Sequence, residues 1–158
     1  MARIQPFRTT RPWRTGAPAL AAVLLASACS VGSPIREGWE VVPGGDLHWE
    51  VRGGGAAIVL LHGGGLDLRQ WDDEVAWLSR DRLTLRYDQR GHGRSLASSA
   101  PYAAHADLRE LLDRQGIGRA VLVGHSNGGR IAIDFTLAHP DRVAGLFLLA
   151  PGVSGWAW

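Results

Sequence analysis

Apolar residues recur along the chain in short runs that predict strands alternating with helices. Four runs have the length and apolar character of strands buried in a sheet: residues 57–61, 83–87, 120–123 and 143–149. Three segments carry apolar residues at helical spacing: residues 71–78, 103–115 and 127–138. Gly116 and Pro140 follow the second and third of these segments and are typical of helix ends.

A β-hairpin is predicted before this alternation begins. Residues 39–42 and 46–52 flank the turn sequence Pro-Gly-Gly, and the second segment alternates apolar with polar residues. The alternation that follows predicts an α/β fold with a mostly parallel sheet and helices on both faces. In such sheets ligands bind beyond the carboxyl ends of the strands, where two glycine-rich loops follow Leu61 and Val123 here.

The N-terminus has the pattern of an export signal. Four arginines precede an apolar run over residues 17–28, which is too short to span a membrane and ends directly before Cys29, the only cysteine. We therefore expect a lipoprotein-type signal peptide over residues 1–28 and lipidation of Cys29, which would anchor the chain to the cell membrane. The alternative is an ordinary signal peptide and a secreted or periplasmic protein. Residues 29–37 are then a linker, and residues 38–158 form the domain.

Charge and composition exclude several classes of function. The formal net charge is +2, but from Cys29 onward 13 arginines stand against 15 acidic residues. This balance gives no indication of a nucleic-acid partner. Neither of the helical metal-binding spacings His-x-x-Glu and His-Glu-x-x-His occurs, so no metal site is predicted, and no cofactor is implied.

Ser126 lies in the sequence Gly124-His125-Ser126-Asn127-Gly128, between a predicted buried strand and a predicted helix. This is the context of a nucleophile elbow, a sharp turn that needs small neighbours and exposes the serine hydroxyl above the sheet. The helix that begins there favours developing negative charge. The alternative is that the serine only caps the helix in a tight strand-to-helix turn.

A second glycine-rich motif, His62-Gly63-Gly64-Gly65, follows the strand at residues 57–61 and lies 64 residues before Ser126. A glycine loop at that edge can direct backbone N–H groups at a substrate oxygen, as an oxyanion hole requires. A flexible turn is the alternative interpretation.

The segments VLLHGGG, YDQRGHGRS and VLVGHSNGGR, with Trp71 between the first two, resemble the α/β-hydrolase superfamily in order and spacing. The resemblance is to its serine-nucleophile, esterase- or lipase-like branch and covers only the N-terminal portion of that fold. It implies that Ser126 is a nucleophile for an ester, thioester, lactone or amide. It also implies an oxyanion hole formed by the backbone N–H groups of Gly64 and Asn127. The residues that support this loop would be His62, Gly63 and Gly65.

The same resemblance predicts what the chain lacks. In this family the triad acid and histidine follow the serine, but only 32 residues follow Ser126 here. Asp134 lies within a predicted helix, and His139 and Asp141 are expected at the opposite edge of the sheet. We therefore expect a fold truncated after about the sixth strand, with little or no turnover and with residues 143–149 as an exposed edge.

Three functional hypotheses remain at this point. The first is a truncated serine hydrolase that acts on a small acyl substrate. The second is a non-catalytic, lipid-anchored binding module derived from a hydrolase. In the third, a second chain supplies the missing half of the enzyme.

Overall fold

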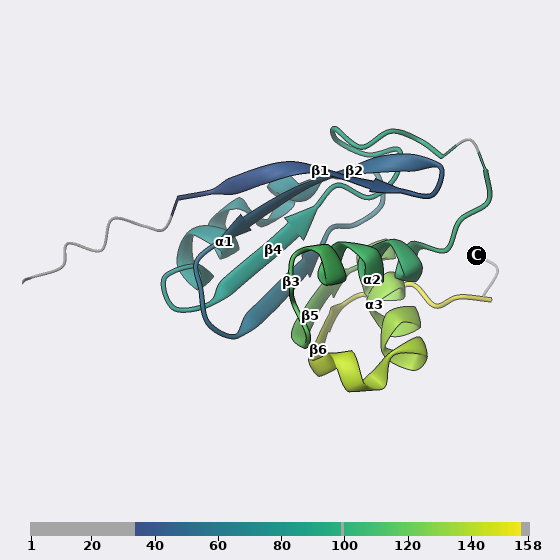
Figure 1. Ribbon diagram of the computed structural model, residues 1–158. Helices are drawn as coiled ribbons and strands as arrows, with labels where there is room; N and C mark the ends of the chain where they lie inside the picture. Colours follow the sequence, from purple (N-terminus) through teal and green to yellow (C-terminus); the bar gives the residue numbers. More distant parts are fainter. Residues whose placement is uncertain (1–33, 99, 156–158) are drawn as a thin grey trace, which may run out of the picture.

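Figure 1 shows the computed structural model of the chain, which describes residues 34–98 and 100–155. The predicted signal peptide and Cys29 lie outside the described residues. Six strands form one sheet: β1 (Arg36–Val42), β2 (Gly45–Arg52), β3 (Ala57–Leu61), β4 (Leu83–Tyr87), β5 (Ala120–His125) and β6 (Val143–Leu149). The helices are α1 (Asp72–Leu78), α2 (Ala104–Arg114) and α3 (Asn127–Ala138), with short 3₁₀ turns η1 (Leu68–Trp71) and η2 (Pro140–Arg142).

The sheet has the strand order β1-β2-β4-β3-β5-β6. β1 and β2 form the predicted hairpin and join the sheet antiparallel to β4. β4, β3, β5 and β6 are mutually parallel. The chain moves from β3 to β4 and then returns across β3 to β5, so the crossovers lie on opposite faces. This topology confirms the predicted α/β fold.

Helices cover both faces of the sheet (Figure 1). On one face, α2 and α3 bury Leu111 and Phe135 against a core that includes Leu122 of β5. On the other face, Trp71 and Val75 pack against Leu60 of β3. The central strands are buried on both sides, which explains why their sequences are apolar runs rather than alternating patterns.

The hairpin begins earlier than the sequence predicts. Arg36 pairs with Val51, so β1 starts three residues before the predicted position and overlaps the linker expected over residues 29–37. Gly45 pairs with Val42, which leaves Pro43 and Gly44 as the turn, and Gly44 has φ +83°. A glycine suits this position because it adopts positive φ without strain.

β6 is an edge strand of the described sheet, as expected. Val143 and Leu148 pack against the core, whereas Phe147 is 59% exposed and Leu146 and Leu149 are also exposed. The strand contains no charged residue. In the described segments no helix combines the length and the apolar character that a membrane crossing needs.

Candidate functional site

Ser126 occupies a strained turn between β5 and α3. Its φ of +49° and ψ of −112° lie outside the regions that residues with a side chain favour. Its N–H donates to the carbonyl of Leu149 at 2.9 Å, and its carbonyl accepts from the N–H of Gly152 at 2.9 Å. Such strain costs on the order of 1–3 kcal/mol and persists only where the surroundings hold it. The chain therefore makes a sharp strand-to-helix turn here, which is the local geometry that a nucleophile elbow requires.

The glycines around Ser126 are required by close backbone approach. A Cβ at Gly124 would lie 2.6 Å from the carbonyl oxygen of Gly128, and a Cβ at Gly129 would lie 2.7 Å from Cβ of Pro151. Both distances are shorter than packed atoms tolerate. The first turn of α3 thus lies directly against the end of β5, which keeps Ser126 at the carboxyl edge of the sheet.

The second glycine loop lies beside this turn. The N–H of Gly63 donates to Oε1 of Gln70 at 2.9 Å, and Gly65 has φ +74°. A Cβ at Gly64 would lie 3.8 Å from Cβ of Asn127, so the loop and the start of α3 are adjacent. Within the described part of the chain, neither the Gly64 N–H nor the Asn127 N–H donates a hydrogen bond. Two unused backbone donors therefore lie close to Ser126.

His62 holds this loop and has no free ring nitrogen. The backbone N–H of Gln89 donates to Nε2 at 3.0 Å, so Nδ1 carries the proton and donates to the carbonyl of Gly63 at 2.7 Å. The side chain is fully buried, and burial lowers the pKa of His62 below 6.5. His62 is thus a neutral structural residue and cannot serve as the base.

The other candidate acids and bases lie away from Ser126. His139 and Asp141 lie at or beside η2, before β6, which is the opposite edge of the sheet from Ser126. Asp134 lies within α3 and accepts from the hydroxyl of Ser154 at 2.6 Å. Nδ1 of His125 is buried against the glycine loop at residues 62–65, 2.6 Å from where a Cβ at Gly63 would lie. Within the described residues no side chain forms a hydrogen bond with Oγ of Ser126, so none of them is paired with the serine as a triad base would be.

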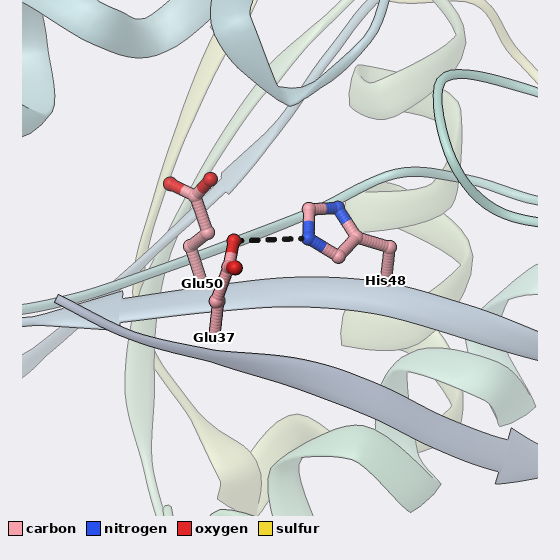
Figure 2. Close-up of side chains that lie close together, drawn as sticks. All are labelled: Glu37, His48 and Glu50. Carbon is pink, nitrogen blue, oxygen red and sulfur yellow. Dashed lines mark ion pairs between the residues drawn. The ribbon is translucent and has the colours of Figure 1, made fainter.

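Glu37, His48 and Glu50 form a cluster that has the composition of a metal site (Figure 2). One donor atom from each lies within 4.8 Å of the others. Two of these potential ligand atoms already accept hydrogen bonds from arginines. Arg94 Nη1 donates to His48 Nε2 at 3.0 Å, and Arg86 Nη2 donates to Glu50 Oε2 at 2.6 Å. We interpret the cluster as an ion-pair network, because the arginines supply the positive charge that a metal would bring.

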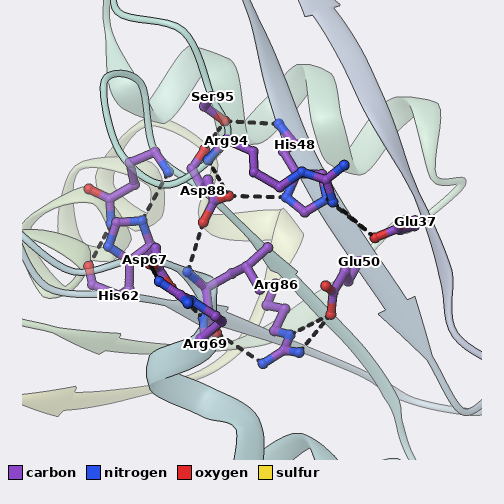
Figure 3. A network of polar contacts seen from close by, with 12 residues as sticks. Glu37, His48, Glu50, His62, Asp67, Arg69, Arg86, Asp88, Arg94 and Ser95 are labelled. Atoms are coloured by element: carbon purple, nitrogen blue, oxygen red, sulfur yellow. Dashed lines mark hydrogen bonds and ion pairs between the residues drawn. The ribbon is translucent and has the colours of Figure 1, made fainter.

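Asp88, directly after β4, joins this cluster to the rest of the site (Figure 3). Its carboxylate accepts from the backbone N–H groups of Leu68 at 2.8 Å and Arg94 at 2.9 Å, and from Nδ1 of His48 at 3.0 Å. Arg90 in the same loop makes a two-pronged contact with Asp107 of α2 at 2.6 and 2.8 Å. This loop therefore ties β2, η1 and α2 together, in keeping with a structural role.

A hollow of about 550 Å³ is lined by Gly65 and Leu66 of the glycine loop. Two further hollows near these elements differ in what they can hold. A cavity of about 20 Å³ beside Asn127, Arg130 and His92 has room for about one water molecule. A larger hollow of about 360 Å³ is lined by residues of the Asp88 network and not by Ser126 or Gly64. Neither is an acyl-binding pocket next to the serine.

Sequence reasoning missed Gln89 and Arg130. Gln89 Nε2 donates to the carbonyl of His62 at 2.5 Å, and Arg130 Nε donates to Oδ1 of Asn127 at 3.0 Å. Gln89 lies in the motif YDQRGHGRS, but nothing in that pattern shows which way its side chain points. These contacts follow only from the three-dimensional arrangement.

Comparison with known proteins establishes the family. The family described as "alpha/beta hydrolase fold" matches residues 56–157, which is well over half of the chain. The chain therefore belongs to the α/β-hydrolase family.

Three relatives illustrate its neighbourhood. The chain is 35% identical to the putative carbamate hydrolase RutD of Caulobacter vibrioides over 119 residues, covering 70% of this chain and 43% of RutD. It is 40% identical to lipase LipV of Mycobacterium tuberculosis over 114 residues, and this match covers 69% of this chain and 43% of LipV. The structure of Est816, an N-acyl homoserine lactone degrading enzyme, matches with a TM-score of 0.70 and 31% identity. This match covers 73% of this chain and 46% of the Est816 chain. The chain spans less than half the length of these relatives.

Proposed function

We propose that this chain carries the nucleophile and the oxyanion hole of a serine hydrolase that acts on ester-like acyl substrates. One observation carries the proposal: Ser126 has a strained backbone and lies beside two backbone N–H groups, of Gly64 and Asn127, that donate to no described residue. A lipase and a lactone-degrading enzyme among the similar proteins agree with an acyl substrate.

The chemistry follows from this arrangement. Oγ of Ser126 attacks the carbonyl carbon, a C–O bond forms, and the carbonyl π electrons move onto the oxygen. The N–H groups of Gly64 and Asn127 stabilise that oxyanion, and each such donor typically contributes on the order of 3 kcal/mol to the transition state. The serine proton must pass to a base, and the leaving alcohol must then receive a proton.

We propose that the base and its orienting acid come from outside the described residues, from a continuation of the chain or from a second polypeptide. The chain alone should therefore turn over esters slowly or not at all. Turnover of p-nitrophenyl acetate that Ser126→Ala abolishes would show that a base is present on this chain and would refute this part of the proposal.

The nucleophile itself can be tested without turnover. A neutral p-nitrophenyl alkylphosphonate reacts when the serine hydroxyl loses its proton to solvent and Oγ attacks phosphorus, so that the Oγ–P bond forms, the P–O bond to the leaving group breaks and p-nitrophenolate leaves. Mass spectrometry of peptides then locates the modified serine. We expect modification of Ser126 in preference to the half-buried Ser98 and the exposed Ser154. Equal modification of all three would contradict the assignment.

We also propose that Cys29 is lipidated and that the chain is anchored to the membrane. The support is the sequence alone: an arginine-rich start and an apolar run that ends at a single cysteine. Incorporation of labelled palmitate during bacterial expression, lost in Cys29→Ser, is the expected result. Equal incorporation in both proteins would rule the site out.

A further inference from the structure

A continuous chain of side-chain hydrogen bonds links the start of α3 to the end of β3. Arg130 Nε donates to Asn127 Oδ1 at 3.0 Å, and Asn127 Nδ2 donates to Gln89 Oε1 at 2.6 Å. Gln89 Nε2 then donates to the backbone carbonyl of His62 at 2.5 Å. We call the side chains of Asn127 and Gln89 the amide bridge. It joins the helix that follows Ser126 to the loop that contains Gly64.

The polarity of the amide bridge is fixed at both ends. Arg130 can only donate, so the Asn127 atom that faces it must be the oxygen. The carbonyl of His62 can only accept, so the Gln89 atom that faces it must be nitrogen. The remaining Asn127 nitrogen and Gln89 oxygen then face each other as donor and acceptor. Reversing either amide would oppose two donors or two acceptors, so each side chain has one satisfied orientation.

Gln89 is also bound to the same loop through its backbone. Its N–H donates to Nε2 of His62, whose Nδ1 donates to the carbonyl of Gly63. Gln89 is 95% buried, so water competes little for its side chain. Both ends of Gln89 therefore fix the segment at residues 62–63, directly before Gly64.

We propose that Asn127 and Gln89 are positioning residues that set the spacing between the two backbone donors of the oxyanion hole. The inference rests on the proposed function and assigns the side chain of Asn127 a task separate from that of its N–H. Donors must lie within about 0.5 Å of the productive geometry to stabilise a transition state. The amide bridge supplies this constraint between the loop at residues 62–64 and the start of α3, through Gln89 and Asn127, which are 38 residues apart in the sequence.

A double-mutant cycle tests the proposal. Gln89→Met and Asn127→Leu keep approximate side-chain size and remove the hydrogen bonds. Each should slow phosphonate modification of Ser126 about tenfold, since small misplacements of catalytic groups have large kinetic effects. The double variant should lose no more than either single variant, because both remove the same link. Losses that multiply, or single variants within about twofold of the wild type, would overturn the proposal.

A control and a second measurement separate positioning from general stability. Thr136→Val removes a partly buried hydrogen bond to the carbonyl of Ala132 elsewhere in α3, and it should leave the modification rate unchanged. The buried N–H of Gly63 donates to Oε1 of Gln70 at 2.9 Å and is protected from exchange. Hydrogen exchange at this amide should become faster in both bridge variants and not in Thr136→Val. Unchanged exchange at Gly63 would overturn the amide bridge even if Ser126 reacts. If instead Ser126 does not react in the wild type, the proposed function fails, and the exchange result still decides the bridge.

Discussion

Ser126 combines a positive φ with a backbone held by hydrogen bonds to Leu149 and Gly152. The glycine loop at residues 62–65, which lies beside Ser126, is constrained as well. Both ring nitrogens of His62 form hydrogen bonds that hold this loop. At this scale the site consists of backbone geometry rather than of titrating side chains. Substitutions at Ser126 and at His62 test that view.

The strain at Ser126 predicts that glycine stabilises the fold relative to alanine. Ser126→Ala keeps the Cβ that makes φ +49° costly, whereas Ser126→Gly removes it. We expect the glycine variant to exceed the alanine variant by about 1 kcal/mol in free energy of unfolding, after allowing for the greater flexibility of glycine in the unfolded chain. Urea denaturation measures the difference. An alanine variant as stable as the glycine variant would show that the turn is unstrained.

His62 predicts a loss of stability in mild acid. Burial lowers its pKa below 6.5, and the nearby His92 lowers it further, while its hydrogen bond to Gly63 and the charges of Asp88 and Asp67 act in the opposite direction. Below pH 6.5 the unfolded chain therefore binds a proton that the folded chain does not. The free energy of unfolding falls as the pH drops from there to the lowered pKa, and it then levels off.

His62→Gln is the matched variant for this prediction, because an amide oxygen can still accept from the N–H of Gln89. Urea midpoints at about pH 7.5 and about pH 5.5 should differ more in the wild type than in His62→Gln. The same pH dependence in both proteins would assign the effect to other groups.

At the scale of elements, the site depends on how closely α3 approaches the sheet. The sequence predicted each helix and each central strand, because buried parallel strands are apolar runs and the covering helices have apolar faces. It did not predict that β1 begins at Arg36, since Arg36 and Glu37 show no apolar pattern and pair only through their backbones.

Because α3 lies so close to the sheet, one methyl group added at Gly124 should lower the stability of the fold strongly. Gly124→Ala would place a Cβ 2.6 Å from the carbonyl of Gly128 and should cost about 2 kcal/mol or more of stability. Gly118→Ala is the control, because a Cβ there meets no atom within 4 Å. It should change stability by less than about 0.5 kcal/mol. Equal effects in thermal or urea unfolding would contradict the packing described for the elbow.

The exposed edge of β6 predicts self-association. An uncharged strand with exposed apolar residues and an unpaired edge is a template for pairing with another chain. Phe147→Lys should shift the purified protein toward the monomer in light scattering coupled to gel filtration. Leu137→Lys, at a 78% exposed position on α3, should not. The same shift in both variants would point to a general solubility effect.

At the scale of the whole molecule, we propose that the chain contains one side of a catalytic site. Its sequence located Ser126 and the His62–Gly65 loop, because both are local motifs attached to predictable strands. The amide bridge could not be predicted, since it joins the side chains of Asn127 and Gln89 from segments that meet only in the fold. The chain spans less than half the length of the relatives, and our proposal is that the base for Ser126 comes from outside the described residues.

The pH dependence of phosphonate modification at Ser126 tests this account most directly. Without a base the reactive species is the serine alkoxide, so the rate should rise about tenfold per pH unit between about pH 6 and about pH 9. Modification should be confined to Ser126 and be lost in Ser126→Ala. A rate that instead levels off near pH 7 would reveal a histidine base on this chain, and modification that survives Ser126→Ala would contradict the assignment of the nucleophile.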